Sequence, residues 1–119
     1  MILEALNYAA SWPLTSAGHR PFIRSSVNLW ARANRCASAW VEHESRTKAA
    51  ILAAAERCRQ RRTVVVLGSG LLRDVPVAEL SRLFDTVVLV DLVHLASVRF
   101  RLRRKRLHNV RLIERDVSG

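Results

Sequence analysis

The residues that most clearly suggest ligand binding form a glycine-rich turn, Gly68-Ser69-Gly70, which directly follows the apolar run Thr63–Leu67. Glycines in such a turn can adopt positive φ and leave room for another group beside the backbone. The helix expected after the turn directs free N–H groups toward it, and anions or polar ligand groups bind in such places. A lone G-x-G is a weak signal by itself, because a simple tight turn between a strand and a helix has the same composition.

A second candidate is Asp91, which follows the next apolar run, Thr86–Val90, and stands 21 positions after Gly70. A carboxylate at that place can accept both hydroxyl protons of a ribose. It can also cap the following helix, and the two roles are compatible. In the dinucleotide fingerprint G-x-G-x-x-G the third position is Arg73 here, which cannot supply the close helix–strand packing of a glycine. The pattern therefore disfavours an NAD-binding oxidoreductase fragment but leaves it as an alternative.

These residues need a scaffold, and the second half of the chain supplies the pattern for one. Thr63–Leu67 and Thr86–Val90 are apolar beyond their first residue, which is typical of strands that are buried on both faces of a parallel sheet. Val110–Ile113 is a third strand candidate. Apolar spacing predicts helices over residues 75–84 and 94–106, with Asp74 capping the first of them. The order β-α-β-α-β predicts an α/β fold with a partial, Rossmann-like parallel sheet.

Residues 1–62 differ in character, and we expect them to form an N-terminal helical segment that precedes a half-domain over residues 63–119. Residues 11–22 contain two prolines and a glycine and are predicted to be a loop. Helical spacing follows from Ser26 to about Glu44, and a second helix is expected from about Ser45 to Arg59. The pattern does not decide between two helices and one bent rod. Three tryptophans are expected mainly as packing anchors, with a ligand pocket as the alternative; they are Trp12, Trp30 and Trp40.

The segments VVVLGSGLLRDVP, FDTVVLVDLVHL and NVRLIERDVSG together resemble the front half of a class I S-adenosylmethionine-dependent methyltransferase, over residues 63–119. The resemblance implies that Gly68, Ser69 and Gly70 face the methionine part of S-adenosyl-L-methionine and that Asp91 holds the ribose hydroxyls. It implies that Asp116, which follows the third strand, approaches the adenine; from the residues alone, Asp116 could equally be an ordinary turn aspartate.

The same resemblance likens the helices over residues 26–60 to the N-terminal cap that covers the cofactor in such enzymes. The chain departs from the usual motif at Leu72, where many members carry a third glycine.

No fourth strand follows residue 113, so we expect the outer edge of strand 63–67 to be open. An open apolar edge invites pairing with a second copy, with a partner chain or with a continuation of a longer reading frame. We therefore expect a truncated methyltransferase-like protein that is incomplete for catalysis, and we assign no catalytic residue. Each of the four histidines is expected at the surface or in a cap; they are His19, His43, His94 and His108.

Charge gives a second hypothesis. The 119-residue chain carries a formal net charge of +10, and one basic cluster spans Arg99–Arg106. Such a charge attracts phosphate-rich partners or anionic membranes, so a non-enzymatic nucleic-acid-binding module is an alternative function. Cys36 and Cys58 lack metal-ligand spacing, and no apolar run approaches the ~18 residues of a membrane span. We expect a cytoplasmic protein with neither a metal nor a membrane partner.

Overall fold

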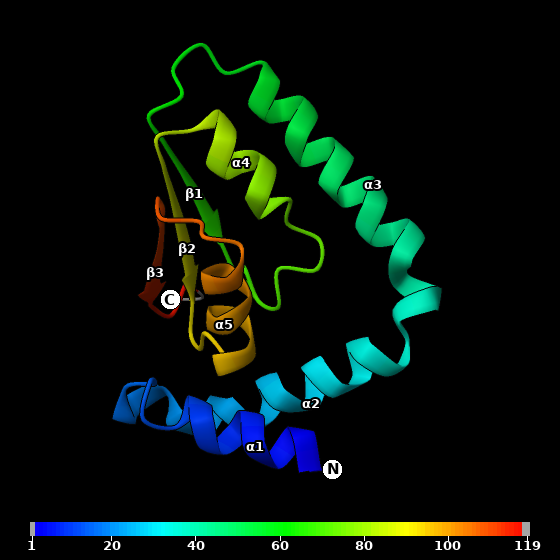
Figure 1. Cartoon of the computed structure of the whole chain (residues 1–119), viewed down its shortest axis with the longest axis vertical. Coiled ribbons are helices and arrows are strands. Elements are labelled where there is room, and N and C mark those ends of the chain that lie inside the picture. Colours follow the sequence, from blue (N-terminus) through cyan, green and yellow to red (C-terminus); the bar gives the residue numbers. More distant parts are fainter. Residues whose placement is uncertain (1, 118–119) are drawn as a thin grey trace.

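The computed structural model describes residues 2–117, which form a mixed α/β fold around a three-stranded parallel sheet (Figure 1). In chain order the elements are α1 (Ile2–Ser11), the 3-10 helix η1 (Ala17–Phe22), α2 (Ile23–Arg35), α3 (Ala37–Glu56), β1 (Thr63–Leu67), α4 (Val77–Leu83), β2 (Thr86–Asp91), α5 (Ala96–Arg104) and β3 (Val110–Glu114). The predicted α/β class and the alternation of strands and helices are confirmed.

The sheet has the order β1-β2-β3, with β1 at one edge among the described strands. The register pairs Leu67 with Val90 and Asp91 with Glu114. Because the strands are parallel, their carboxyl ends meet at one edge of the sheet. The turn after β1 and Asp91 at the end of β2 therefore lie at the same edge of the sheet, as the sequence predicts, and the residue paired with Asp91 on β3 is Glu114.

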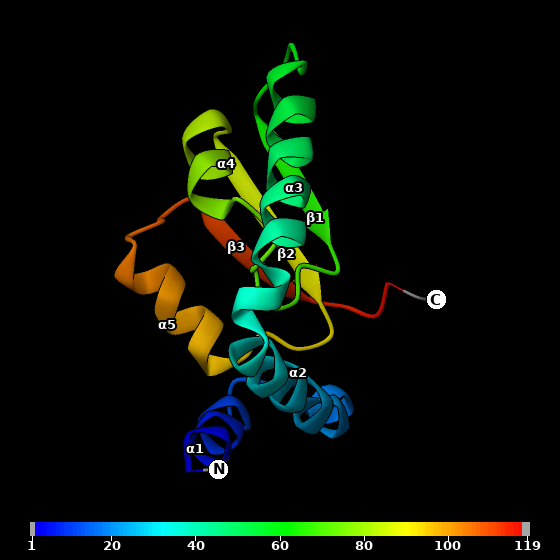
Figure 2. The same ribbon diagram turned by 90° about the vertical axis from the view of Figure 1, so that its right-hand side faces the viewer.

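One face of the sheet carries the helices, and the other carries none in the described part of the chain. Helices α3, α4 and α5 lie on the same side of the strands in two perpendicular views (Figures 1 and 2). On the covered side Val87 and Leu89 are fully buried, whereas on β1 Val65 and Leu67 are 53% and 66% exposed. The prediction that this strand is buried on both faces is wrong, because an apolar strand pattern does not reveal whether a second layer is present.

The core lies between the sheet and the helices, and the N-terminal half contributes to it. One buried cluster contains residues from both halves of the chain, and the N-terminal helices contribute Ile23 and Val27 of α2 and Ala55 of α3. The strands and helices after residue 62 add Leu72, Leu80, Leu89, Val98 and Leu102, among others. Helices α2 and α3 are therefore held by the same burial of apolar side chains that holds the sheet.

The N-terminal helices differ from the prediction in their boundaries. Part of the expected loop over residues 11–22 is the 3-10 helix η1, and α1 precedes it. The rod breaks at Cys36 rather than near residue 45, so α2 and α3 are separate helices. The sequence carries no glycine or proline at this break, so the helical spacing continues across it. In α5, Phe100 is 62% exposed, whereas Val98 and Leu102 are buried.

Helix α1 is attached to α5 through side chains that cap α5. The residue before α5, Leu95, makes no side-chain cap. Instead the Ala96 N–H donates to Ser11 Oγ at 2.8 Å, and the Ser97 N–H donates to Asn7 Oδ1 at 3.2 Å. Two otherwise unsatisfied N–H groups of α5 are thus satisfied from a helix some 85 positions earlier in the chain.

Within residues 2–117 we find no helix whose length and apolar character would allow it to cross a membrane.

Candidate functional site

The glycine turn and the acidic end of β2 are in direct contact. The Gly70 N–H donates to Asp91 Oδ2 at 2.6 Å, and the Leu92 N–H donates to Asp91 Oδ1 at 2.7 Å. Gly68 and Gly70 have φ values of 68° and 55°, the left-handed region that glycine adopts without steric penalty. The Asp91 carboxylate is therefore fixed at the crevice, and each of its oxygens retains capacity to accept a further hydrogen bond.

A cavity of about 300 Å³ opens over the glycine turn. Its volume is at the lower end of the range of small-molecule sites, roughly 300–1,000 Å³. The lining comes from α2, α3 and the turn: Leu29, Trp40, His43, Glu44, Gly68, Ser69, Gly70, Leu71, Arg73 and Asp74. Three of the five predicted site residues, Gly68 to Gly70, thus line one cavity, and Asp91 contacts the third of them.

Ser69 supplies an observation that favours a polar ligand at this turn. The residue is 2% exposed, and its hydroxyl has no hydrogen-bond partner among the described residues. A buried hydroxyl without a partner is destabilising unless a ligand or water satisfies it. Beside it, a Cβ built on Gly68 would meet no atom within 4 Å, so the space next to this backbone is free. The turn therefore has room for a ligand and an unsatisfied group to bind it.

Helix α3 forms the opposite wall of the cavity. Trp40, His43 and Glu44 have the i, i+3, i+4 spacing that places side chains on one face of a helix, and all three line the cavity. The sequence prediction treated Trp40 mainly as a packing anchor and gave no role to Glu44. The spacing of the three was a signal that could have identified them, but only the fold shows which face of α3 meets the turn.

Arg73, which occupies the third fingerprint position, forms an ion pair with Glu44. Arg73 Nε lies 2.6 Å from Glu44 Oε2, and Nη2 lies 3.3 Å from Oε1. The pair joins the segment after the glycine turn to α3. Leu72, in place of the usual third glycine, adopts φ 62° while only 1% of its surface is exposed. The chain thus makes the left-handed turn with a leucine that also fills the core.

Asp74 is not the helix cap that the sequence predicts. Helix α4 begins at Val77, and Pro76 precedes it without a side-chain cap. Asp74 lines the cavity instead. Pro76 has a ψ of 67°, outside the helical region, so α4 begins two residues later than predicted, and Asp74 does not occupy the position directly before it.

Asp116 is exposed in the segment after β3 and is not among the residues that line the cavity. The acidic residue that contacts the η1 segment at this strand end is Glu114. Its Oε2 accepts hydrogen bonds from Ser16 Oγ at 2.7 Å and the Ser16 N–H at 3.1 Å, and His19 Nδ1 lies 3.2 Å away. Burial alone would raise the pKa of Glu114, but the hydrogen bonds from Ser16 and His19 outweigh it and lower the pKa. Glu114 thus anchors η1 across the carboxyl end of the sheet.

His94 is buried, contrary to the expected surface or capping position. Only 1% of its surface is exposed, and Nε2 lies 2.9 Å from the Ile113 carbonyl oxygen. Burial lowers the pKa of His94, partly offset by that hydrogen bond. A neutral ring with a proton on Nε2 donates to Ile113 and leaves Nδ1 without a partner among the described residues. His94 is not among the residues that line the cavity.

Compared with protein-family models, with curated proteins and with solved structures, the chain shows no match. Among residues 2–117, no group of three His, Cys, Asp or Glu side chains is arranged to hold a metal ion. The functional argument therefore rests on the geometry of the crevice itself.

Proposed function

We propose that the chain binds S-adenosyl-L-methionine in the crevice between the glycine turn, Asp91 and α3, as a partial, Rossmann-like domain of the class I methyltransferase type. The single observation that carries the proposal is the 2.6 Å contact between the Gly70 N–H and Asp91 Oδ2. It joins a backbone-permissive turn and a carboxylate at the carboxyl ends of two adjacent parallel strands. In open α/β sheets this is the place where nucleoside-containing ligands bind.

The residues around the crevice fit the parts of such a cofactor. The remaining lone pairs of Asp91 can accept the two ribose hydroxyls. The unsatisfied Ser69 hydroxyl and the open space beside Gly68 suit the polar methionine end. Asp74 lines the same cavity, and its carboxylate favours a ligand that carries an ammonium and a sulfonium group, whereas the Glu44 carboxylate is paired with Arg73. When bound, the cofactor supplies a methyl group on a sulfonium centre.

The role of this chain in the reaction is to bind and orient the cofactor. The indole of Trp40 and the backbone of the turn form two walls of the cavity and restrict the access of water. We assign no residue to the methyl acceptor and no catalytic base. The outer edge of β1 is unpaired within residues 2–117, and a second copy or a partner strand that pairs there would be next to the crevice.

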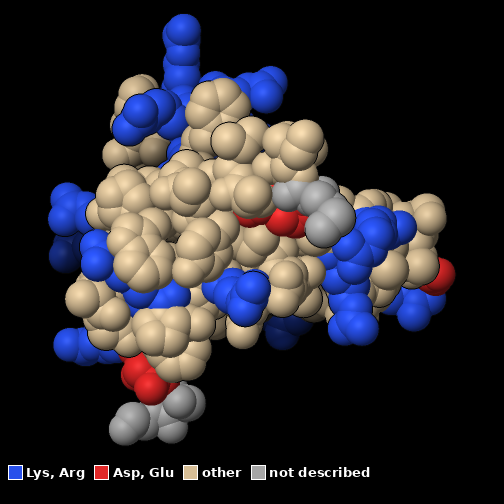
Figure 3. Space-filling view, turned by 90° about the horizontal axis from the view of Figure 1, so that it is seen from below, with Lys and Arg blue, Asp and Glu red and all other residues tan. Residues whose placement is uncertain are grey.

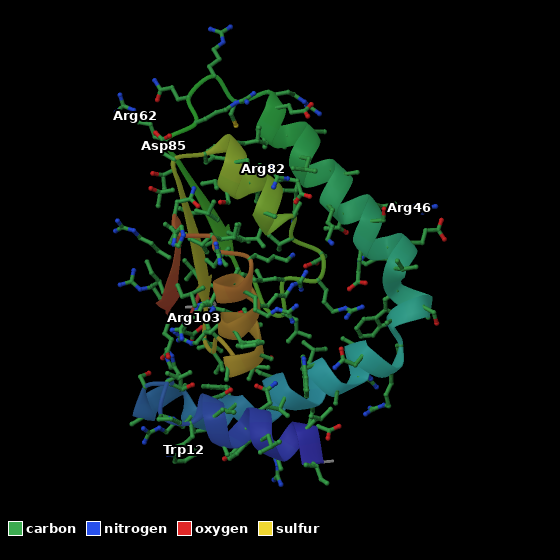
Figure 4. The ribbon with its side chains drawn as sticks, in the orientation of Figure 1. Trp12, Arg46, Arg62, Arg82, Asp85 and Arg103 are labelled. Carbon is green, nitrogen blue, oxygen red and sulfur yellow. The ribbon has the colours of Figure 1, made fainter. Side chains whose placement is uncertain are left out.

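Isothermal titration calorimetry with S-adenosylmethionine, and then with its demethylated product, tests the proposal. Asp91→Asn should weaken binding by about 1–3 kcal/mol, or roughly 5- to 150-fold, since a charged acceptor is lost. Asp85→Asn is the matched control, because Asp85 is exposed and lies at the opposite end of β2 (Figure 4). Folded protein that gives no heat at millimolar ligand would overturn the proposal.

Titration with NADH and with a single-stranded oligonucleotide separates the two remaining alternatives. NADH binding that Asp91→Asn weakens would favour the dinucleotide function. Oligonucleotide binding that falls with salt by about 0.9 log units per log unit of salt for each phosphate contacted would favour the nucleic-acid function. Within the Arg99–Arg106 cluster, Arg99 is engaged by the carbonyl oxygens of His94 and Leu14, whereas Arg101, Arg104 and Lys105 line one depression.

A further inference from the structure

Helix α1 is arranged with its polar residues inward and its apolar residues outward. Asn7 and Ser11 are 7% and 0% exposed, and they are spaced i, i+4 on the face that meets α5. Ile2, Leu3 and Leu6 are 79%, 68% and 60% exposed. A surface helix of a globular protein normally has the opposite arrangement. The inversion follows from the capping of α5, which requires polar side chains on the inner face of α1.

Exposed apolar side chains continue from α1 into the segment that follows it. We define the α1 apolar surface as the large side chains of α1 and of residues 12–14 that are exposed: Ile2, Leu3, Leu6, Tyr8, Trp12 and Leu14. Trp12 lies on the lower side of the molecule, on the side away from the strands (Figure 4). Contiguous apolar surfaces of this kind mark sites of interaction in water-exposed proteins.

Arginines border this surface on two sides. On one side Arg20 stacks over the Trp12 ring at 4.7 Å, and Arg24 lines the same groove as Tyr8 and Trp12. On the side of α5, Arg99 Nη2 donates to the carbonyl oxygen of Leu14 at 3.4 Å. Figure 3 views the molecule from below and shows uncharged residues over much of this side, with Lys and Arg mostly toward the margin and a smaller number of Lys, Arg and acidic atoms near the middle.

We infer that the α1 apolar surface docks on the surface of a membrane that contains anionic lipid. An apolar helix face with tryptophan, tyrosine and leucine inserts shallowly at the headgroup boundary, and flanking cations contact lipid phosphates. A second copy of this chain is the less favoured occupant. Two such surfaces in contact would bring their arginines together, and each chain already carries a formal net charge of +10. The charge pattern matches an anionic layer and opposes self-association.

The docking is independent of the proposed cofactor site. The α1 apolar surface and the Gly68–Gly70 cavity share no residue, although α2 contributes different residues to the groove beside α1 and to that cavity. Membrane binding can therefore succeed or fail whatever the outcome of the cofactor titration.

The test is flotation of the full chain with vesicles of phosphatidylcholine alone or with phosphatidylglycerol added. We expect binding to the mixed vesicles that weakens several-fold for each arginine side chain removed from the border. Leu3→Ser/Leu6→Ser should reduce the partition coefficient by about ten- to hundred-fold, because two exposed leucines no longer insert. Val65→Ser/Leu67→Ser is the matched control: these residues are similarly exposed but lie on β1, and the double variant should bind as the wild type does.

A second measurement does not depend on a leucine variant that folds. In a Trp30→Phe/Trp40→Phe protein, Trp12 is the remaining tryptophan, and a lipid with a brominated acyl chain should quench its fluorescence. If anionic vesicles neither quench Trp12 fluorescence nor carry the protein in flotation, the inference is overturned. It is also overturned by equal loss of binding in both double variants, or by a dimer in sedimentation velocity that Leu3→Ser/Leu6→Ser alone makes monomeric.

Discussion

Glu44 and Arg73 form an ion pair that closes one side of the cavity, with 2.6 Å between Arg73 Nε and Glu44 Oε2. Their side chains are 12% and 28% exposed, so solvent screens this pair much less than it screens a typical surface pair. The pair joins α3 to the segment that follows the glycine turn. We therefore expect it to hold the wall of the cavity in place.

The first prediction concerns this pair. Glu44→Gln should lower the free energy of unfolding by about 1–3 kcal/mol, because the Arg73 guanidinium loses its charged acceptor while it remains partly buried. Urea denaturation followed by circular dichroism measures the change. Glu42→Gln is the control, since the Glu42–Arg46 pair is more than 70% exposed on both sides, and its change should stay within about 0.5 kcal/mol. Equal effects of the two variants would contradict the structural role of Glu44.

A second prediction concerns the cap that α1 supplies to α5. Ser11→Ala removes the oxygen that accepts from the Ala96 N–H, and we expect a loss of about 0.5–2 kcal/mol of stability. Hydrogen exchange should show the effect most clearly at the first N–H groups of α5. Ser38→Ala, at an exposed position of α3, is the control and should leave exchange in α5 unchanged. Unchanged exchange at Ala96 in Ser11→Ala would show that the cap does not form.

Leu72 permits a test of its backbone conformation. Leu72→Ala should destabilise the protein by about 2–5 kcal/mol through the cavity left in the core. In most positions a glycine is worse than an alanine by about 0.5–1 kcal/mol. At φ 62° the order should reverse, so that Leu72→Gly is no less stable than Leu72→Ala. Leu80, buried inside α4, is the comparison, and there the glycine variant should be the less stable one.

The buried ring of His94 predicts a dependence of stability on pH. Burial lowers the pKa of His94 below its ordinary value of 6.5, so the unfolded chain binds a proton at a higher pH than the folded chain does. The contribution of neutral His94 to the free energy of unfolding is therefore complete above about pH 6.5. It is lost as the pH falls from there toward the pKa of His94 in the folded protein, by at most about 1.4 kcal/mol per pH unit. His94→Gln should lose less stability between about pH 7.5 and 5.5 than the wild type loses. Parallel curves would rule out this contribution.

Glu114 acts in a separate, more acidic window. Its pKa is lowered from 4.5, so its contribution is complete above about pH 4.5 and is lost below it. The two groups can therefore be distinguished in one series of urea titrations.

The sequence by itself determined the strands and the contact at their ends. The β-branched runs 63–67 and 86–90 and the third strand candidate 110–113 matched β1, β2 and β3 to within one residue, because short runs rich in apolar residues between helical segments are typical of strands. The spacing from Gly70 to Asp91 predicted that the turn and the carboxylate converge, since parallel strands end at the same edge.

Tertiary structure alone decided which surfaces are covered and which polar groups are satisfied. The Ser11–Ala96 cap joins residues that are distant in sequence, so no local pattern encodes it. The exposure of one face of β1 and of the apolar side of α1 depends on which other elements pack against them, and this too is not visible in a local pattern. The choice of Glu114 over Asp116 for the contact with η1 has the same origin. Local spacing fixes the periodicity of an element, whereas the partner of each face depends on how the whole chain packs.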